Sequence, residues 1–170
     1  MAILPILTVP DRRLKQVSQP VTLVDDAVRQ LMDDMAETMY HAIGIGLAAP
    51  QVGVLRRVIC CDVTHAQNGD EKKPVFIANP VIVHQEGDIC WKEGCLSIPE
   101  YHAEVMRFSQ IVVQGLDRDN QPLELKATEL MAVCLQHEVD HLNGKLFIDH
   151  ISALKRSIFM KKLKKKKEET

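Results

Sequence analysis

The chain has 170 residues and a mass of 19.2 kDa, the size of one ordinary domain that can bury a core without disulfides. Hydrophobic residues make up 46% and charged residues 26%, a globular composition that excludes a disordered chain. The net charge is -2, but residues 155–170 carry +6, which leaves -8 on the other 154 residues. An acidic body of this kind disfavours a nucleic-acid-binding core.

The sequence has no apolar run that approaches the ~20 residues needed to cross a bilayer. Its N-terminal segment lacks a basic leader and is interrupted by Pro5 and Pro10, so we expect neither a membrane span nor a signal peptide. The five cysteines are an odd number without the spacing of a disulfide framework. These features favour a reducing, cytoplasmic location.

The first predicted element is a helix at residues 25–40, with Asp25 or Asp26 as its cap. Its apolar side chains follow helical spacing and form one stripe: Val28, Leu31, Met32, Met35 and Met39. Gly44 and Gly46 end this helix and open a loop that runs to Gln51.

From residue 54 the pattern changes to short, β-branched segments separated by turn residues, which is typical of strands. We expect strands at residues 54–63, 75–77, 81–83, 104–107, 111–115 and 123–125. The polar segment 117–121 between the last two predicts a hairpin turn.

Helical spacing returns near residue 128, with Thr128 as a candidate N-cap and Asn143-Gly144 as the stop signal. A last helix is expected over residues 152–162. A helix, then strands, then helices favour an α+β fold. In this fold antiparallel strands pack around a central, motif-bearing α-helix, with an N-terminal and a C-terminal helix beside it.

The sharpest chemical feature is His137-Glu-Val-Asp-His141 in the predicted central helix. Two histidines at i and i+4 lie about 40° apart around a helix, so both rings can reach one metal ion. Glu138 follows the first histidine and can lie beside that ion without binding it. It is then placed to take a proton from a metal-bound water.

A catalytic metal needs three protein ligands and an open position. The third ligand could be another histidine, a cysteine or a carboxylate. One group of zinc peptidases adds a histidine six residues after the motif, but here that position is Phe147.

Among the cysteines, three occupy apolar segments and fit a core: Cys60, Cys61 and Cys134. Cys95 differs because it follows Gly94, and a glycine lets the backbone approach a neighbour closely. Spacing alone does not decide between Cys95 and Cys90.

The chain resembles the peptide deformylase family from about residue 4 to residue 153. Three motifs, in this order, carry the resemblance: Gly44-Ile-Gly-Leu-Ala-Ala-Pro-Gln51, Glu93-Gly-Cys-Leu-Ser97 and Gln136-His-Glu-Val-Asp-His141. The resemblance implies a single catalytic domain over residues 1–153, followed by a basic C-terminal helix or tail at 154–170.

The resemblance further implies a divalent metal held by Cys95, His137 and His141. Fe(II) is the expected native ion, with Zn, Ni or Co possible after purification. The family removes the N-formyl group from the formyl-methionine of nascent polypeptides and releases formate. In such a reaction the metal-bound water attacks the formyl carbon, with Glu138 as general base and then general acid.

Other residue roles are also carried over from the resemblance. The Gln51 amide and the Leu96 N–H would stabilise the oxyanion, and Glu93 with Arg107 would form an ion pair that supports the Cys95 loop. From pattern alone, Gln51 would be a surface residue and the last two solvated charges. The expected substrate-binding residues are Gly44, Ile45, Gly46, Gly94, Val133 and Cys134.

The expected partners are N-formyl-methionyl nascent peptides, with no membrane and a monomeric state. The lysine-rich run at residues 161–167 is most simply a solvated tail. Some bacterial deformylases dock a basic C-terminal helix on the ribosome, so a contact between this run and ribosomal RNA is a further hypothesis.

Three alternatives stay open from sequence. A zinc peptidase would need a third His or Glu ligand in place of Cys95. A cysteine hydrolase that pairs Cys95 with His137 would be indifferent to chelators. A non-catalytic RNA- or ribosome-binding protein would hold a closed, structural metal.

The sequence also departs from the family pattern near the expected substrate entrance. Ile43 stands where several members carry an acidic residue, Val133 stands where an arginine is common, and the segment 100–103 is variable. These departures bear on substrate preference and not on the reaction.

Overall fold

The structure is a computed structural model that describes residues 1–169. Its helices are α1 (Asp26–His41), α2 (Val63–Asn68), α3 (Glu129–Leu142) and α4 (Ala153–Glu168). Its strands are β1 (Gly46–Ala48), β2 (Val58–Cys61), β3 (Val75–Glu86), β4 (Ile89–Cys95), β5 (Ile98–Arg107), β6 (Gln110–Leu116) and β7 (Pro122–Thr128). None of the helices in these 169 residues has the length and apolar content that crossing a membrane requires.

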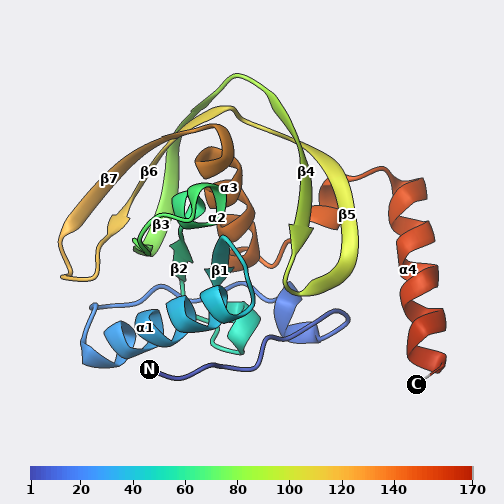
Figure 1. Ribbon diagram of the computed structural model, residues 1–170, viewed down its shortest axis with the longest axis horizontal. Helices are drawn as coiled ribbons and strands as arrows, with labels where there is room; N and C mark the ends of the chain where they lie inside the picture. The colour runs from blue at the N-terminus through green and yellow to red at the C-terminus, as the bar shows by residue number, and fades with distance from the viewer. Residues whose placement is uncertain (170) are drawn as a thin grey trace.

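The strands form two antiparallel sheets. Five of them pair in the order β1-β2-β3-β6-β7, and β4 and β5 form a separate two-stranded ribbon. Helix α3 lies between the large sheet and the ribbon, while α4 stands on the outer side of the ribbon (Figure 1). The α+β fold with antiparallel strands around the motif-bearing helix is thus confirmed.

Helix α3 is central because most of its surface is covered. Ten of its fourteen residues are buried, and it packs against β1, β2, β6 and β7. Its apolar side chains, such as Leu135 and Leu142, join the core of the large sheet. A helix buried almost all round must also bury polar side chains, and these include His137, Glu138 and His141.

Helix α1 begins where the sequence predicts, since the Asp25 carboxylate accepts a hydrogen bond from the Val28 N–H at 3.0 Å. Its end differs from the prediction. The residue in the left-handed conformation is Ile43, with φ 59°, and not Gly44. The segment predicted as a loop contains strand β1 and a short 3-10 helix, Ala49–Val52.

Four of the strand predictions are wrong in extent, and one of them, at 104–107, covers only the end of β5. The predicted strand at 54–63 shrinks to β2 because Asp62 caps helix α2, accepting a hydrogen bond from the His65 N–H. The predicted strands at 75–77 and 81–83 are one strand, β3. The register shifts between Ala78 and Val81, where Pro80 has no N–H to give to the ladder.

The last helix is longer than expected and runs to Glu168. Ser152 caps it by accepting a hydrogen bond from the Lys155 N–H. Phe159 is its buried residue, and its ring lies 4.5 Å from that of Tyr101 on β5. Helix α4 is therefore anchored to the β4-β5 ribbon by an aromatic contact.

Candidate metal and catalytic site

The site lies where the β4-β5 ribbon meets α3. Cys95 is the last residue of β4, and His137 and His141 lie one turn apart on α3. The Cys95 Sγ is 3.4 Å from the His141 Nε2, and the two Nε2 atoms are 3.3 Å apart. All three donor atoms lie within 4.8 Å of one another.

This donor set fits a divalent metal. A tetrahedral ion with ligands at about 2.0–2.3 Å separates those ligands by about 3.3–3.6 Å, which matches the two separations given above. Burial and the neighbouring His137 lower the pKa of His141 well below its usual range, so its ring is held in the neutral form that binds metals. One thiolate and two imidazoles suit Zn, Fe, Ni and Co equally well.

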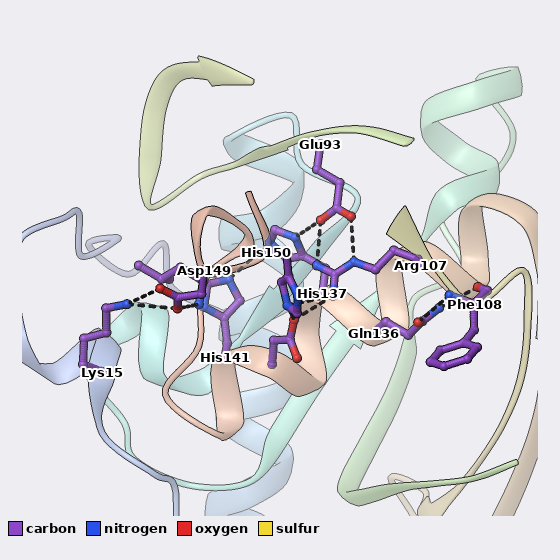
Figure 2. A network of polar contacts seen from close by, with 11 residues as sticks. Lys15, Glu93, Arg107, Phe108, Gln136, His137, His141, Asp149 and His150 are labelled. Carbon is purple, nitrogen blue, oxygen red and sulfur yellow. Dashed lines mark hydrogen bonds and ion pairs between the residues drawn. The ribbon is translucent and has the colours of Figure 1, made fainter. Parts of the chain in front are cut away.

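Glu93 orients the first histidine. Its carboxylate accepts a hydrogen bond from the Arg107 Nε at 2.7 Å and lies 2.8 Å from the His137 Nδ1 (Figure 2). Burial tends to raise the pKa of Glu93, but hydrogen bonds from Arg107 and His137 outweigh it and lower the pKa overall. An ionised Glu93 makes Nδ1 the donor, which leaves the Nε2 lone pair for a metal.

Arg107 belongs to a larger polar network that includes Asp140 on α3 and His150. Arg107 also donates to Asp140 at 2.7 Å, and His150 lies 2.8 Å from the same carboxylate oxygen. The sequence predicted the pairing of Glu93 with Arg107 but missed Asp140 and His150. Asp140 sits inside the histidine motif, yet nothing in its spacing indicates which charge it meets.

Glu138 is buried at the same place without a complete set of partners. Its Oε2 has no hydrogen-bond partner among the residues that the structure describes. Burial is the main reason that the pKa of Glu138 is raised to about 7. A carboxyl group with this pKa can accept and release a proton near neutral pH.

Gln51 is fully buried, contrary to what its pattern alone suggested. Its Oε1 accepts a hydrogen bond from the Ala48 N–H at 2.9 Å. Its Nε2 donates to the Ser97 Oγ at 3.1 Å and lies 3.6 Å from the Cys95 Sγ. The side-chain amide is therefore held in one orientation beside the metal donors.

A cavity of about 490 Å³ opens over these residues. It brings together the expected catalytic and substrate-binding residues, which all line it: Gly44, Ile45, Gly46, Gln51, Gly94, Leu96, Val133, Cys134 and Glu138. Cys60 and Cys61 lie in the core as expected. Cys134 both packs in the core and lines the cavity.

Sequence reasoning missed several residues of the same cavity. The cavity is also lined by Trp91, Tyr101, His102 and Leu130. Ser97 accepts a hydrogen bond from the Gln51 Nε2. Ser97 lies in one of the three quoted motifs, so its position was a usable signal. Leu130 lies on α3 itself, within the helix that the sequence predicts. Trp91, Tyr101 and His102 carry no local pattern, because only the folding of the ribbon over α3 brings them to the cavity.

A Cys/His/His donor set beside a buried carboxylate is the arrangement of a metal-dependent hydrolase. The family model described as polypeptide deformylase matches residues 3–157. The chain is 49% identical over 166 residues to a peptide deformylase from Hydrogenovibrio crunogenus, covering 98% of this chain and 96% of that protein.

Solved structures agree with this match. A peptide deformylase from Legionella pneumophila superimposes with a TM-score of 0.89 at 45% identity, covering 98% of this chain and 96% of the other. One from Ehrlichia chaffeensis in complex with actinonin gives 0.90 at 44% identity, covering 98% of both chains. The chain therefore belongs to the polypeptide deformylase family. It is an enzyme that removes the formyl group from N-formyl-methionyl peptides.

Proposed function

We propose that the protein is a metal-dependent deformylase of nascent chains in which Cys95, His137 and His141 hold the ion. The observation that carries this proposal is the convergence of three donor atoms beside Glu138, whose Oε2 has no partner within residues 1–169. A divalent ion bound there would acidify a water molecule and polarise the formyl carbonyl. Fe(II) is our candidate for the native ion, with Zn, Ni or Co as substitutes.

Glu138 moves the proton in this proposal. Its carboxylate takes a proton from the attacking water and later delivers that proton to the departing amine of methionine. Its pKa of about 7 without a bound ion supports both transfers.

Gln51 and Leu96 stabilise the charge that develops on the formyl oxygen. The Gln51 Nε2 is oriented by Ser97, and the Leu96 N–H follows directly after Cys95 in the chain. Donors fixed before the reaction need no reorganisation in the transition state, and the loss of one costs about 3 kcal/mol of barrier.

The methionine side chain occupies the apolar part of the cavity. Ile45, Leu96 and Val133 line it, and a flexible thioether suits such a pocket. Gly44, Gly46 and Gly94 also line the cavity, and in this proposal their backbone contacts the substrate.

The test is formate release from formyl-Met-Ala-Ser by protein purified without oxygen and loaded with Fe(II) or Ni(II). We expect rapid release by the parent, and release near background for Glu138→Ala with the metal still bound. Cys95→Ala should lose both metal and activity. Activity that survives chelators but not thiol alkylation would point to a cysteine hydrolase. No release by the metal-loaded parent would overturn the proposal.

The location and partners follow from the substrate. We propose a cytoplasmic monomer that acts where nascent chains emerge, with residues 1–153 as its catalytic domain. The basic helix α4 is proposed to contact ribosomal RNA through phosphates. Ribosome binding should then weaken as salt rises and should be lost on deletion of residues 161–170. Binding that is insensitive to salt, or unchanged by the deletion, would contradict this contact.

A further inference from the structure

The end of helix α1 forms a tight turn with an unusual residue in it. The Ile43 N–H donates to the Tyr40 carbonyl at 3.1 Å, and the Gly44 N–H donates to the Met39 carbonyl at 2.9 Å. These two bonds define a Schellman motif, in which the left-handed position is usually glycine and sometimes asparagine. Here that position holds Ile43, with φ 59°.

An isoleucine is strained in this conformation. A β-branched side chain with positive φ is an outlier because its branches crowd the backbone. Within residues 1–169 the other non-glycine residues with positive φ are two asparagines and two glutamates, none of them β-branched: Asn79, Glu100, Asn120 and Glu129.

Burial does not offset this strain in the free protein. Ile43 is 91% exposed, so its side chain adds no core packing to the turn. Gly44, the next residue, packs closely on the loop that carries Cys95, because a Cβ built there would lie 2.8 Å from the Leu96 Cδ1. Strain that persists at an exposed position points to a role in the bound state.

Ile43 lies at the edge of the cavity that contains Glu138. The formyl end of a substrate must reach Glu138 and the metal donors, so the rest of the peptide leaves past the cavity edge. We propose that Ile43 is a specificity-determining residue that contacts an aliphatic side chain at one of the two positions after methionine. This inference rests on the proposed function and names the substrate class that the site prefers.

The experiment compares formyl-Met-Leu-Ala, formyl-Met-Ala-Leu and formyl-Met-Ala-Ala in the metal-loaded parent, Ile43→Asn and Ile43→Val. Asparagine suits the left-handed conformation, so Ile43→Asn should melt at a higher temperature than the parent. The ratio of kcat/KM for one of the two leucine peptides to kcat/KM for the alanine peptide should be roughly five-fold lower in Ile43→Asn than in the parent. The effect is modest because a contact at the cavity edge buries less apolar surface than a closed pocket. Ile43→Val should retain the preference.

Leu154→Asn is the matched control, because it removes another exposed aliphatic side chain, at 71% exposure, from helix α4. Its peptide preference should equal that of the parent. Titration of the Trp91 fluorescence with Met-Leu-Ala, Met-Ala-Leu and Met-Ala-Ala measures binding without turnover, since Trp91 lines the cavity and is the only tryptophan.

Each outcome bears on one proposal. An absence of turnover in the parent contradicts the proposed deformylation, and the titration then still tests Ile43. If Ile43→Asn keeps the leucine preference in both measurements, or if the parent has none, the inference is overturned.

Discussion

The carboxylate of Glu138 lies directly against the backbone of Gly46. A Cβ added to Gly46 would be 2.6 Å from the Glu138 Oε1 and 2.7 Å from the Cys134 Sγ. Both distances are shorter than a carbon atom allows, so any side chain at this position of β1 displaces the carboxylate.

Gly46→Ala should therefore reduce turnover by about a hundred-fold, because a displacement near 1 Å is enough to misplace a reacting group. The added methyl group meets side-chain ends, so the chain should still fold and bind its metal. Formate release, metal content and thermal melting measure the three effects.

Gly69→Ala is not a suitable control, because Gly69 has φ 68° and alanine would be strained there. Ala42→Ser, outside the cavity, serves better. Full activity of Gly46→Ala would show that the position of Glu138 is not critical.

We expect Ser97 to affect turnover less than Gln51, because Ser97 acts only by orienting the Gln51 amide. Ser97→Ala removes the hydroxyl that orients the Gln51 Nε2, while the Ala48 N–H still holds the other end of the amide. We expect kcat to fall about ten-fold in Ser97→Ala and about 10²- to 10³-fold in Gln51→Ala. KM and metal content should change little. Equal losses in the two variants would contradict this order.

Asp62 makes stability depend on pH. Its carboxylate is buried and accepts hydrogen bonds from the Tyr40 hydroxyl at 2.5 Å, the Lys73 N–H at 2.8 Å and the His65 N–H at 3.1 Å. Burial tends to raise the pKa of Asp62, but these donors outweigh it and lower the pKa below its usual value.

The ionised form of Asp62 is thus favoured more in the folded than in the unfolded chain, where an aspartate titrates near ~3.9. Its contribution to the free energy of unfolding is complete above about pH 5 and is lost as the pH falls below about 4. Asp62→Asn should be about 1–3 kcal/mol less stable at pH 7, with a smaller difference near pH 3.5. Urea unfolding measures both. Asp70→Asn, at an exposed position, is the control and should leave the free energy of unfolding at pH 7 nearly unchanged.

Phe159 anchors helix α4, so its truncation should loosen that helix selectively. Phe159→Ala removes a buried ring that packs on Tyr101, which costs about 3 kcal/mol of local stability. Hydrogen exchange should accelerate in α4 and remain slow in α3. Ile158→Ala changes a neighbouring residue that is 47% exposed and should have little effect. Uniform acceleration in both helices would mean that α4 and the core unfold as one unit.

The sequence predicted the parts of the fold that local rules control. Helix α1 and the central helix α3 have strong apolar periodicity and recognisable caps, so their bounds were close. Strand β4 was missed because its inward position at Glu93 is charged, and this breaks the apolar alternation that indicates a strand. A buried charge is understandable only once its partner Arg107 is known.

The candidate site was likewise predictable only where its residues lie close together in the sequence. His137, Glu138 and His141 share one helix turn, so their proximity could be derived from spacing. Cys95 could be chosen over Cys90 only through the resemblance, because its distance from α3 depends on how the ribbon folds. The burial of Gln51 and the strained turn at Ile43 also depend on tertiary packing, which single-residue patterns do not record.

The three metal donors come from two elements that are far apart in the sequence, β4 and α3, and this affects the free energy of unfolding. The structure contains five free cysteines, so no disulfide joins the ribbon to the rest of the chain. Cys95 and His137 are 42 positions apart in the sequence, and an ion that binds both would close a loop of that length, as a disulfide does. The unfolded chain offers no such preformed site, so the free energy of metal binding adds to the free energy of unfolding. The ion that serves the chemistry would also act as the cross-link between β4 and α3.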